Sequence, residues 1–318
     1  MVINILLIIL GIAMVLFGAD RLTEGASELA RRMRMSEMVI GLTVVAFGTS
    51  MPEFVISLNS ALKGSTDLAV GNVVGSNIFN TLLIIGVAAM VTPITIKKET
   101  VKRDCPFGLF ASVVLLILCI DRLSPVIRGN HISRIDGISL LVMFAAFMYL
   151  TLKGAKNADF IDTSSQQKPI SLRLSIVYFL SGLGLLIWGS DIFVDAAVGV
   201  AKALNVSESV IGLTIVAFGT SLPELATSVV AAKKGKSEMA IGNVVGSNVF
   251  NILWILGCTA VVCPLTIHGI NIIDLAMMIV SMTMFWLFSY TRYKIERWEG
   301  LMLTLVFIAY IAFLIANA

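Results

Sequence analysis

The chain contains ten runs of apolar residues, nearly all of them long enough to cross a bilayer, separated by polar connections. About 20 consecutive apolar residues form a helix that spans the hydrocarbon core. With 58% hydrophobic and only 14% charged residues, the chain has too little polar surface for a water-soluble fold. We therefore predict an all-α polytopic membrane protein with ten transmembrane helices, at residues 2–20, 38–62, 67–92, 105–121, 135–152, 173–193, 209–232, 238–262, 271–290 and 298–316.

The two halves of the chain are copies of each other. Residues 39–96 align without a gap with residues 210–267, at a constant offset of 171, and are identical at about 35 of 58 positions. Each half carries five predicted helices, an odd number, so the second half must enter the membrane from the opposite side. Inverted repeats of this kind are typical of secondary transporters. We predict a first five-helix repeat at 1–152, a linker at 153–172 and a second, inverted repeat at 173–318.

Basic residues predict the orientation in the membrane. Of the 23 Lys and Arg residues, 18 lie in the connections that follow the first, third, fifth, seventh and ninth predicted helices, and five lie elsewhere. Cytoplasmic connections are enriched in Lys and Arg. We therefore expect a multi-pass protein of the cell membrane whose linker is cytoplasmic and whose two termini are extracellular. The chain has no basic, aromatic-rich stretch of the kind that binds nucleic acid, and we expect no such partner.

Two glutamates lie deep inside predicted helices. Glu53 ends the stretch "AFGTSMPE" and Glu224 ends its repeat copy, "AFGTSLPE". A carboxylate near the bilayer centre costs roughly 2.5 kcal/mol or more. Neither span contains a Lys or Arg that could neutralise it. We therefore predict that both glutamates face the bundle interior and bind a cation.

The residues before each glutamate support that prediction. Pro52 and Pro223 cannot donate a backbone hydrogen bond, and a glycine lies four residues earlier in each copy. We expect a kinked or unwound segment that frees backbone carbonyls near 46–50 and 217–221. Such hard oxygen ligands suit calcium, sodium or magnesium rather than zinc or copper, and no cofactor is expected. Hydroxyl oxygens are available from Thr49, Ser50, Thr220 and Ser221.

The following helix in each half carries a polar stripe. The stretch "GNVVGSNIFN" at 71–80 recurs as "GNVVGSNVFN" at 242–251. Spacings of four residues place Asn72, Ser76 and Asn80 on one helix face, and likewise Asn243, Ser247 and Asn251. Small residues allow close helix packing, the role we predict for Gly71, Gly75, Gly242 and Gly246. Both interhelical hydrogen bonding and ion binding remain open for Asn72, Asn77, Asn243 and Asn248.

These motifs resemble the alpha-repeats of a known family. "GTSMPE" and "GTSLPE", each followed by "GNVVGSN" and "FN", are similar to the sodium/calcium exchanger family of the cation/calcium exchanger superfamily, in its compact prokaryotic form. The resemblance covers essentially the whole chain. It implies a bundle of the second to fifth and seventh to tenth helices, across which the first and sixth helices lie and slide.

The resemblance also implies the ion ligands. Calcium is expected to be held by Glu53 and Glu224 with the carbonyls of Thr49 and Thr220. Asn80 and Asn251 are expected to complete the central site. The sodium sites are expected to use carbonyls near Ala46 and Ala217 and the side chains of Ser50, Ser76, Ser221 and Ser247.

The expected function is antiport of sodium and calcium by alternating access, not catalysis. The resemblance implies three sodium ions per calcium, which is electrogenic, and protons should compete for the carboxylates. Potassium-dependent relatives carry an aspartate where this chain has Asn251, so potassium independence is expected. We expect a monomer. Two alternatives remain: a calcium/proton antiporter, although those proteins usually lack the "GTSxPE" form, and a cation channel, although a tightly binding carboxylate pair favours a carrier.

Overall fold

The computed structural model describes residues 1–119, 131–157, 170–204, 217–267 and 271–316, and these segments are helical with four two-residue strands. The helices and π-helical turns (η) of the first half are α1 (Val2–Arg32), α2 (Glu37–Ile40), η1 (Gly41–Val45), α3 (Ala46–Thr49), α4 (Met51–Leu62), α5 (Thr66–Ile78), η2 (Phe79–Ile84), α6 (Ile85–Val91), η3 (Thr100–Asp104), α7 (Cys105–Cys119) and α8 (Arg134–Asn157). Those of the second half are α9 (Leu172–Ala203), α11 (Ala217–Thr220), α12 (Leu222–Lys233), α13 (Ser237–Val249), η5 (Phe250–Ile255), α14 (Leu256–Val262), α15 (Ile272–Arg292) and α16 (Arg297–Ala316).

The described helices confirm a multi-pass membrane protein. Seven of them are long and apolar enough to cross a membrane, and the bent pair Glu37–Thr49 and Met51–Leu62 can form an eighth span. Helix α7 corresponds to the fourth predicted span but has only 15 residues, and residues 209–216 of the seventh predicted span lie outside the described part. The count of ten helices therefore stays a prediction.

Helices α1 and α9 extend well beyond their predicted ends. Helix α1 has 31 residues and ends at Arg32, whereas its predicted span ends at 20. Helix α9 has 32 residues and ends at Ala203, whereas its predicted span ends at 193. Asp20 and Asp191, expected at the helix ends, therefore lie inside the helices. At 1.5 Å per residue each helix is about 45 Å long, whereas the hydrocarbon core is roughly 30 Å thick. The end of the apolar run in the sequence therefore does not mark the end of either helix. Helix α8 likewise continues to Asn157, into the predicted linker, of which residues 158–169 lie outside the described part.

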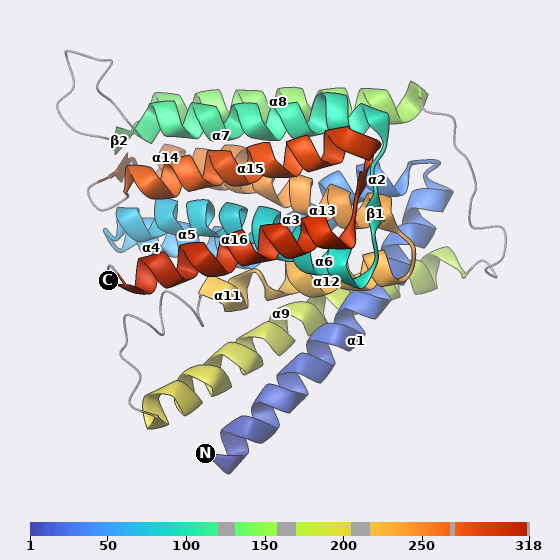
Figure 1. Cartoon of the computed structure of the whole chain (residues 1–318), viewed down its shortest axis with the longest axis horizontal. Helices are drawn as coiled ribbons and strands as arrows, with labels where there is room; N and C mark the ends of the chain where they lie inside the picture. The colour runs from blue at the N-terminus through green and yellow to red at the C-terminus, as the bar shows by residue number, and fades with distance from the viewer. Residues whose placement is uncertain (120–130, 158–169, 205–216, 268–270, 317–318) are drawn as a thin grey trace.

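Helices α1 and α9 form a pair that runs obliquely beside the remaining helices (Figure 1). Glycines allow their backbones to touch. A Cβ atom placed on Gly18 would lie 2.8 Å from the Gly182 carbonyl oxygen, and one on Gly11 would lie 2.8 Å from that of Gly189. The first and sixth predicted helices thus lie across the rest of the protein, as the sequence resemblance implies.

The interior of the bundle is formed largely by α13 and α5. Every residue from Met239 to Val249 of α13 is buried. Helix α13 contacts η1 so closely that a Cβ atom on Gly246 would lie 2.8 Å from the Leu42 carbonyl oxygen. The predicted packing role is therefore confirmed for Gly242 and Gly246. The repeat-equivalent partner of Gly71 and Gly75 falls mainly in residues 210–216, outside the described part.

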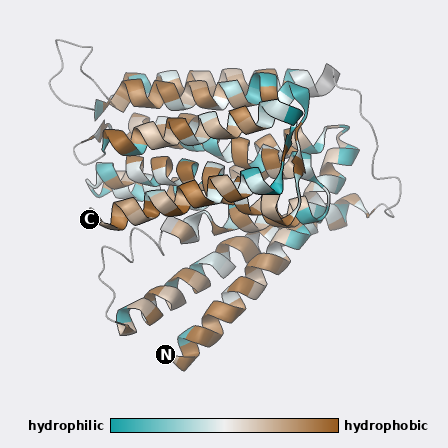
Figure 2. Ribbon diagram, in the orientation of Figure 1, coloured by the Kyte–Doolittle hydropathy of each residue, from teal (hydrophilic) through white to brown (hydrophobic). Residues whose placement is uncertain are grey.

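Four short strands connect helix ends at the periphery of the bundle. Strand β1 (Ile94–Thr95) pairs antiparallel with β4 (Lys294–Ile295), and β2 (His131–Ile132) pairs antiparallel with β3 (Leu265–Thr266). Figure 2 shows apolar residues along much of the length of the long helices. Large apolar side chains of these helices, such as Phe17, Trp188 and Leu305, are exposed. An apolar exterior of this kind suits contact with lipid.

Candidate functional site

Both predicted motifs are interrupted at a serine, and each buried glutamate is the third residue of the helix that follows the interruption. The helical stretch Glu37–Thr49 and α4 are bent by 46° relative to each other, and Ser50 lies between them. Ser221 lies at the equivalent position between α11 and α12. The segment is not unwound, because the Ser50 amide donates to the Ala46 carbonyl at 3.0 Å. Pro52 lies in the first turn of α4, where an amide hydrogen is not needed, so the helix bends without losing its turns.

The two glutamates are held by hydroxyls from the opposite half of the chain. Ser50 donates a hydrogen bond to Glu224 Oε1 at 3.1 Å, and Ser221 donates to Glu53 Oε1, also at 3.1 Å. Both carboxylates are only 1% exposed. This reciprocal pairing places the bends of the two repeats against each other. It therefore brings two acidic groups into one buried centre.

Hydroxyls from α13, α5 and α11 complete the surroundings of the carboxylates. Ser247 lies 3.5 Å from Glu224 Oε1, and Ser221 lies 3.3 Å from the hydroxyl oxygen of Ser76. The Thr220 side chain lies within hydrogen-bonding reach of Glu53. All these side chains are buried, so water cannot freely replace their contacts.

Four buried oxygen atoms of this centre have no hydrogen-bond partner in the part of the chain that the structure describes. They are Glu53 Oε2, Glu224 Oε2, Asn80 Oδ1 and Asn251 Oδ1. Leaving a buried polar atom unsatisfied costs about 1–3 kcal/mol. A cluster of such atoms therefore indicates a binding site for an ion or water. Two carboxylates and two amide carbonyls match the ligands of a hard cation such as calcium or sodium.

Asn80 and Asn251 lie in π-helical turns, which the sequence reading missed. They are the second residues of η2 and η5, and these two turns occupy equivalent positions at the repeat offset of 171. A π-helical turn shifts the side chains that follow it relative to an α-helix, and such turns are frequent at functional sites. Asn80 and Asn251 are 1% and 0% exposed. The only sequence signal for these turns is the repeated "FN" itself.

The remaining predicted site residues lie close by and also make other contacts. The Thr49 side chain lies within hydrogen-bonding reach of Glu224. The Thr49 hydroxyl is 3.1 Å from both the Val45 carbonyl oxygen and Asn243 Oδ1. The Ala46 carbonyl oxygen, which the sequence predicts to be free, accepts the Ser50 amide at 3.0 Å and lies 3.4 Å from the Thr49 hydroxyl oxygen. Ala217 is the first residue of α11, and its side chain lies outside the described part.

Asn72 and Asn243 form hydrogen bonds between neighbouring helices, one of the two roles that the sequence leaves open for them. The Asn72 amide group donates to the Glu53 carbonyl oxygen at 3.2 Å and to the Ser57 hydroxyl at 3.0 Å. Asn243 makes the equivalent contacts, at 3.4 Å to the Glu224 carbonyl and at 3.0 Å to the hydroxyl of its own repeat's serine. Each asparagine thus fixes the backbone of the glutamate that precedes it in the chain.

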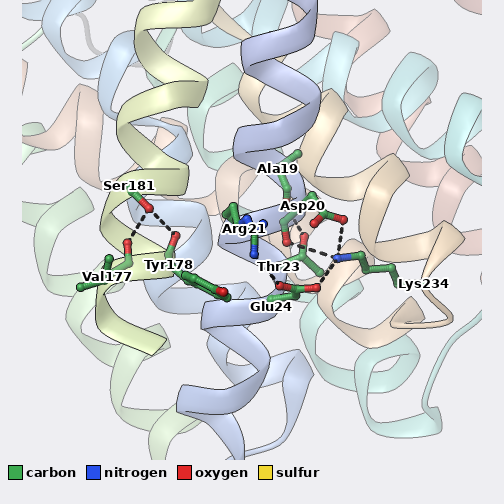
Figure 3. Close-up of polar contacts among 9 residues, drawn as sticks. All are labelled: Ala19, Asp20, Arg21, Thr23, Glu24, Val177, Tyr178, Ser181 and Lys234. Atoms are coloured by element: carbon green, nitrogen blue, oxygen red, sulfur yellow. Dashed lines mark hydrogen bonds and ion pairs between the residues drawn. The ribbon is translucent and has the colours of Figure 1, made fainter. Parts of the chain in front are cut away.

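Ion pairs connect α1 to the end of α12 (Figure 3). Lys234 Nζ lies 2.5 Å from Asp20 Oδ1 and 3.4 Å from Glu24 Oε1. Lys234 follows the last residue of α12, the helix that carries Glu224. These contacts therefore join the α1–α9 pair to one half of the candidate site. Partly exposed ion pairs contribute little free energy, so this contact can break at low cost.

A second lysine of the same connection is partly buried. Lys236 Nζ donates a hydrogen bond to the Ser27 hydroxyl at 2.6 Å, and Ser27 donates to Glu37 Oε1 at 2.9 Å. Burial lowers the pKa of the Lys236 ammonium from its ordinary value, while the nearby Glu37 carboxylate opposes that shift. The connection thus links α1, α2 and α13 at one end of the bundle.

Membrane-length apolar helices around a buried cluster of carboxylate, hydroxyl and amide oxygens define a multi-pass membrane protein built for ion transport. A family model described as sodium/calcium exchanger protein matches residues 3–153 and 174–316, which is nearly the whole chain. The chain belongs to this family of cation/calcium exchangers.

Several curated relatives and solved structures are similar over their full length. The sodium/calcium exchanger MaX1 of Methanosarcina acetivorans is 31% identical, with 98% of each chain covered. The inner membrane protein YrbG of Escherichia coli is 36% identical over 97% of this chain and 95% of its own. A structure of the sodium-calcium exchanger NCX_Mj, soaked with sodium and calcium ions, is 32% identical, covers 98% of each chain and superposes with a TM-score of 0.84.

Proposed function

We propose that the protein is an antiporter that exchanges sodium ions for calcium across the cell membrane by alternating access. The observation that carries this proposal is the set of four buried oxygens, two from each repeat, that have no hydrogen-bond partner among the described residues. A buried carboxylate pair whose charge no described basic residue balances is stabilised when a bound cation, or a competing proton, compensates that charge. The similarity to MaX1 and NCX_Mj, both described as sodium/calcium exchangers, supports calcium and sodium as the transported ions.

The charge of the site supports a competition mechanism. Two carboxylates neutralise one calcium ion, and sodium ions that occupy overlapping oxygens displace it, so the two fluxes are coupled. Three sodium ions per calcium, the ratio that the sequence resemblance implies, move net charge across the membrane. Asn251 contributes an amide instead of a third carboxylate, which supports independence from potassium.

The ligand assignment follows the same division. We assign calcium to the carboxylates of Glu53 and Glu224 and the carbonyls of Thr49 and Thr220. Sodium is assigned to the carbonyls of Ala46 and Ala217 and the hydroxyls of Ser50, Ser76, Ser221 and Ser247. Asn80 and Asn251 complete the central position.

The proposed topology has ten helices in two inverted repeats, with the linker cytoplasmic, both termini extracellular and the protein acting as a monomer. The bias of basic residues toward one set of connections supports this orientation. Helices α1 and α9 are the proposed moving pair. The glycine contacts hold α1 and α9 together as one unit, and the partly exposed ion pairs of Lys234 can break as that unit slides against the bundle.

Sodium-driven uptake of radioactive calcium into proteoliposomes tests the proposal. Glu53→Gln and Glu224→Gln each remove one charge from the site at nearly constant volume, and both should abolish uptake. Glu299→Gln is the matched control, because Glu299 is 4% exposed and its Oε2 accepts the Glu296 amide, which a glutamine oxygen can also do. Normal uptake by both site variants would overturn the proposal.

The same vesicles show which ion gradient drives calcium uptake and whether the transport cycle moves net charge across the membrane. Uptake driven by a proton gradient but not by a sodium gradient would identify a calcium/proton antiporter. Unitary currents in planar bilayers would identify a channel. Calcium flux that ignores an imposed membrane potential would rule out the electrogenic ratio while leaving exchange intact.

A further inference from the structure

Five buried side chains form a hydrogen-bonded network between the two repeats. Asn80 and Asn251 of this network lie one helical turn after Ser76 and Ser247, the serines that border the carboxylate centre. Asn248 Nδ2 lies 2.8 Å from Thr81 Oγ1, and Asn80 Nδ2 lies 3.1 Å from Asn248 Oδ1. Asn77 Nδ2 lies 3.2 Å from the Asn248 carbonyl oxygen, and Asn251 Nδ2 lies 3.0 Å from Asn77 Oδ1. All five side chains are at most 5% exposed. The network therefore links both halves through contacts that water cannot easily replace.

The network has two branches, and Thr81 fixes the amide orientations in the first, which runs from Thr81 through Asn248 to Asn80. Its hydroxyl donates its single hydrogen to the Asn77 carbonyl oxygen at 2.8 Å, so toward Asn248 it can only accept. Asn248 must therefore turn its NH₂ group toward Thr81 and its oxygen toward Asn80. Asn80 must then donate through Nδ2. Its carbonyl oxygen is left without a partner in the part of the chain that the structure describes.

A backbone carbonyl fixes the amide orientations in the second branch, which runs from the Asn248 carbonyl oxygen through Asn77 to Asn251. The Asn248 carbonyl oxygen can only accept, so Asn77 must turn its NH₂ group toward it. The Asn77 side-chain oxygen then faces Asn251, which donates through Nδ2. The Asn251 carbonyl oxygen is the second amide oxygen left without a partner among the described residues.

We propose that Thr81, Asn77 and Asn248 are positioning residues that hold the amides of Asn80 and Asn251 with both oxygens turned toward the bound cation. This inference rests on the proposed cation site. An asparagine side chain is nearly symmetric in shape, so packing alone does not decide which end faces the ion. A reversed amide presents NH₂ hydrogens to the cation and repels it. The network therefore prevents the reversed amide orientation already in the ion-free protein.

The two branches differ in a way that makes the proposal testable. The repeat equivalent of Thr81 is Ile252, which has no hydroxyl. The orientation of Asn80 therefore depends on one side-chain hydroxyl, whereas the orientation of Asn251 depends on a backbone carbonyl. Loss of the Thr81 hydroxyl should release Asn80 and leave Asn251 in place.

The test is calcium binding to the purified full-length protein, measured with radioactive calcium in sodium-free buffer. Thr81→Val removes the hydroxyl and keeps the shape, and it should weaken calcium binding about tenfold, as loss of an outer-shell hydrogen bond does at other metal sites. Thr81→Ser keeps the hydroxyl and should restore the wild-type affinity. Thr259→Val is the matched control, because Thr259 is fully buried and its hydroxyl has no partner among the described residues.

A double-mutant cycle separates positioning from general packing. In an Asn80→Ala background, Thr81→Val should weaken binding no further, because the group it orients is gone. In an Asn251→Ala background it should still cause the full loss. An equal loss in both backgrounds, or no loss in the wild type, would overturn the positioning role.

The positioning role and the proposed exchange fail in different experiments. Calcium binding by the wild type without sodium-driven uptake would overturn the exchange and leave the positioning role standing. Normal uptake by the wild type, together with unchanged calcium affinity of Thr81→Val, would overturn the positioning role alone. Cooperative thermal unfolding of Thr81→Val well above the assay temperature would exclude misfolding as the cause of weaker binding.

Discussion

Removing the Ser221 hydroxyl should destabilise the ion-free protein, and calcium should offset part of the loss. Ser221 is fully buried and donates to Glu53 Oε1 at 3.1 Å, while Glu53 Oε2 has no partner among the described residues. At a pH where Glu53 is ionised, a hydrogen bond to its charged carboxylate contributes about 1.5–3 kcal/mol. Ser221→Ala should therefore cost about 2 kcal/mol in the presence of a chelator. At about 2 °C per kcal/mol for a chain of this size, the melting temperature falls by roughly 4 °C.

The measurement is thermal unfolding in detergent, with a chelator and with saturating calcium. Ser281→Ala is the control, because Ser281 is also fully buried but donates to the neutral Met278 carbonyl at 2.7 Å. It should cost about 1 kcal/mol and show no dependence on calcium. The Ser221→Ala deficit should shrink with calcium, because the cation then supplies the missing partner. A deficit equal to that of Ser281→Ala, or one that calcium leaves unchanged, would refute the reasoning.

Three further predictions concern packing, ion pairs and protons. Gly246→Ala places a methyl group 2.8 Å from the Leu42 carbonyl oxygen and should destabilise the protein by about 1–3 kcal/mol in thermal unfolding, whereas Gly184→Ala, which meets no described atom within 4 Å, should not. Lys234→Gln should lower the free energy of unfolding by about 1 kcal/mol or less, and the difference should vanish at high salt; Lys63→Gln, at the repeat-equivalent position, serves as the control. Protons should compete with calcium for the two carboxylates, so sodium-driven uptake should fall as the pH drops from about 8 to about 5, and a flat profile would contradict this.

The sequence predicts features that lie within each repeat, but it does not predict the contacts between the two repeats. Each glutamate is visible in the sequence as an unpaired charge in an apolar run, and the kink follows from the proline beside it. The reciprocal bonds of Ser50 with Glu224 and of Ser221 with Glu53 are not visible, because they join segments more than 160 residues apart. The end of α1 was also misplaced, since hydropathy reports where a helix leaves the hydrocarbon and not where its hydrogen bonding ends.

The sequence by itself determined the membrane class, the doubled motif and the two buried carboxylates. These follow from local composition and from a repeat that can be read one residue at a time. Only the tertiary structure decided that Asn77 and Asn248 serve as hydrogen-bond partners and that Asn80 and Asn251 keep free oxygens. An amide can donate or accept, and which it does is set by the neighbours that the fold brings to it.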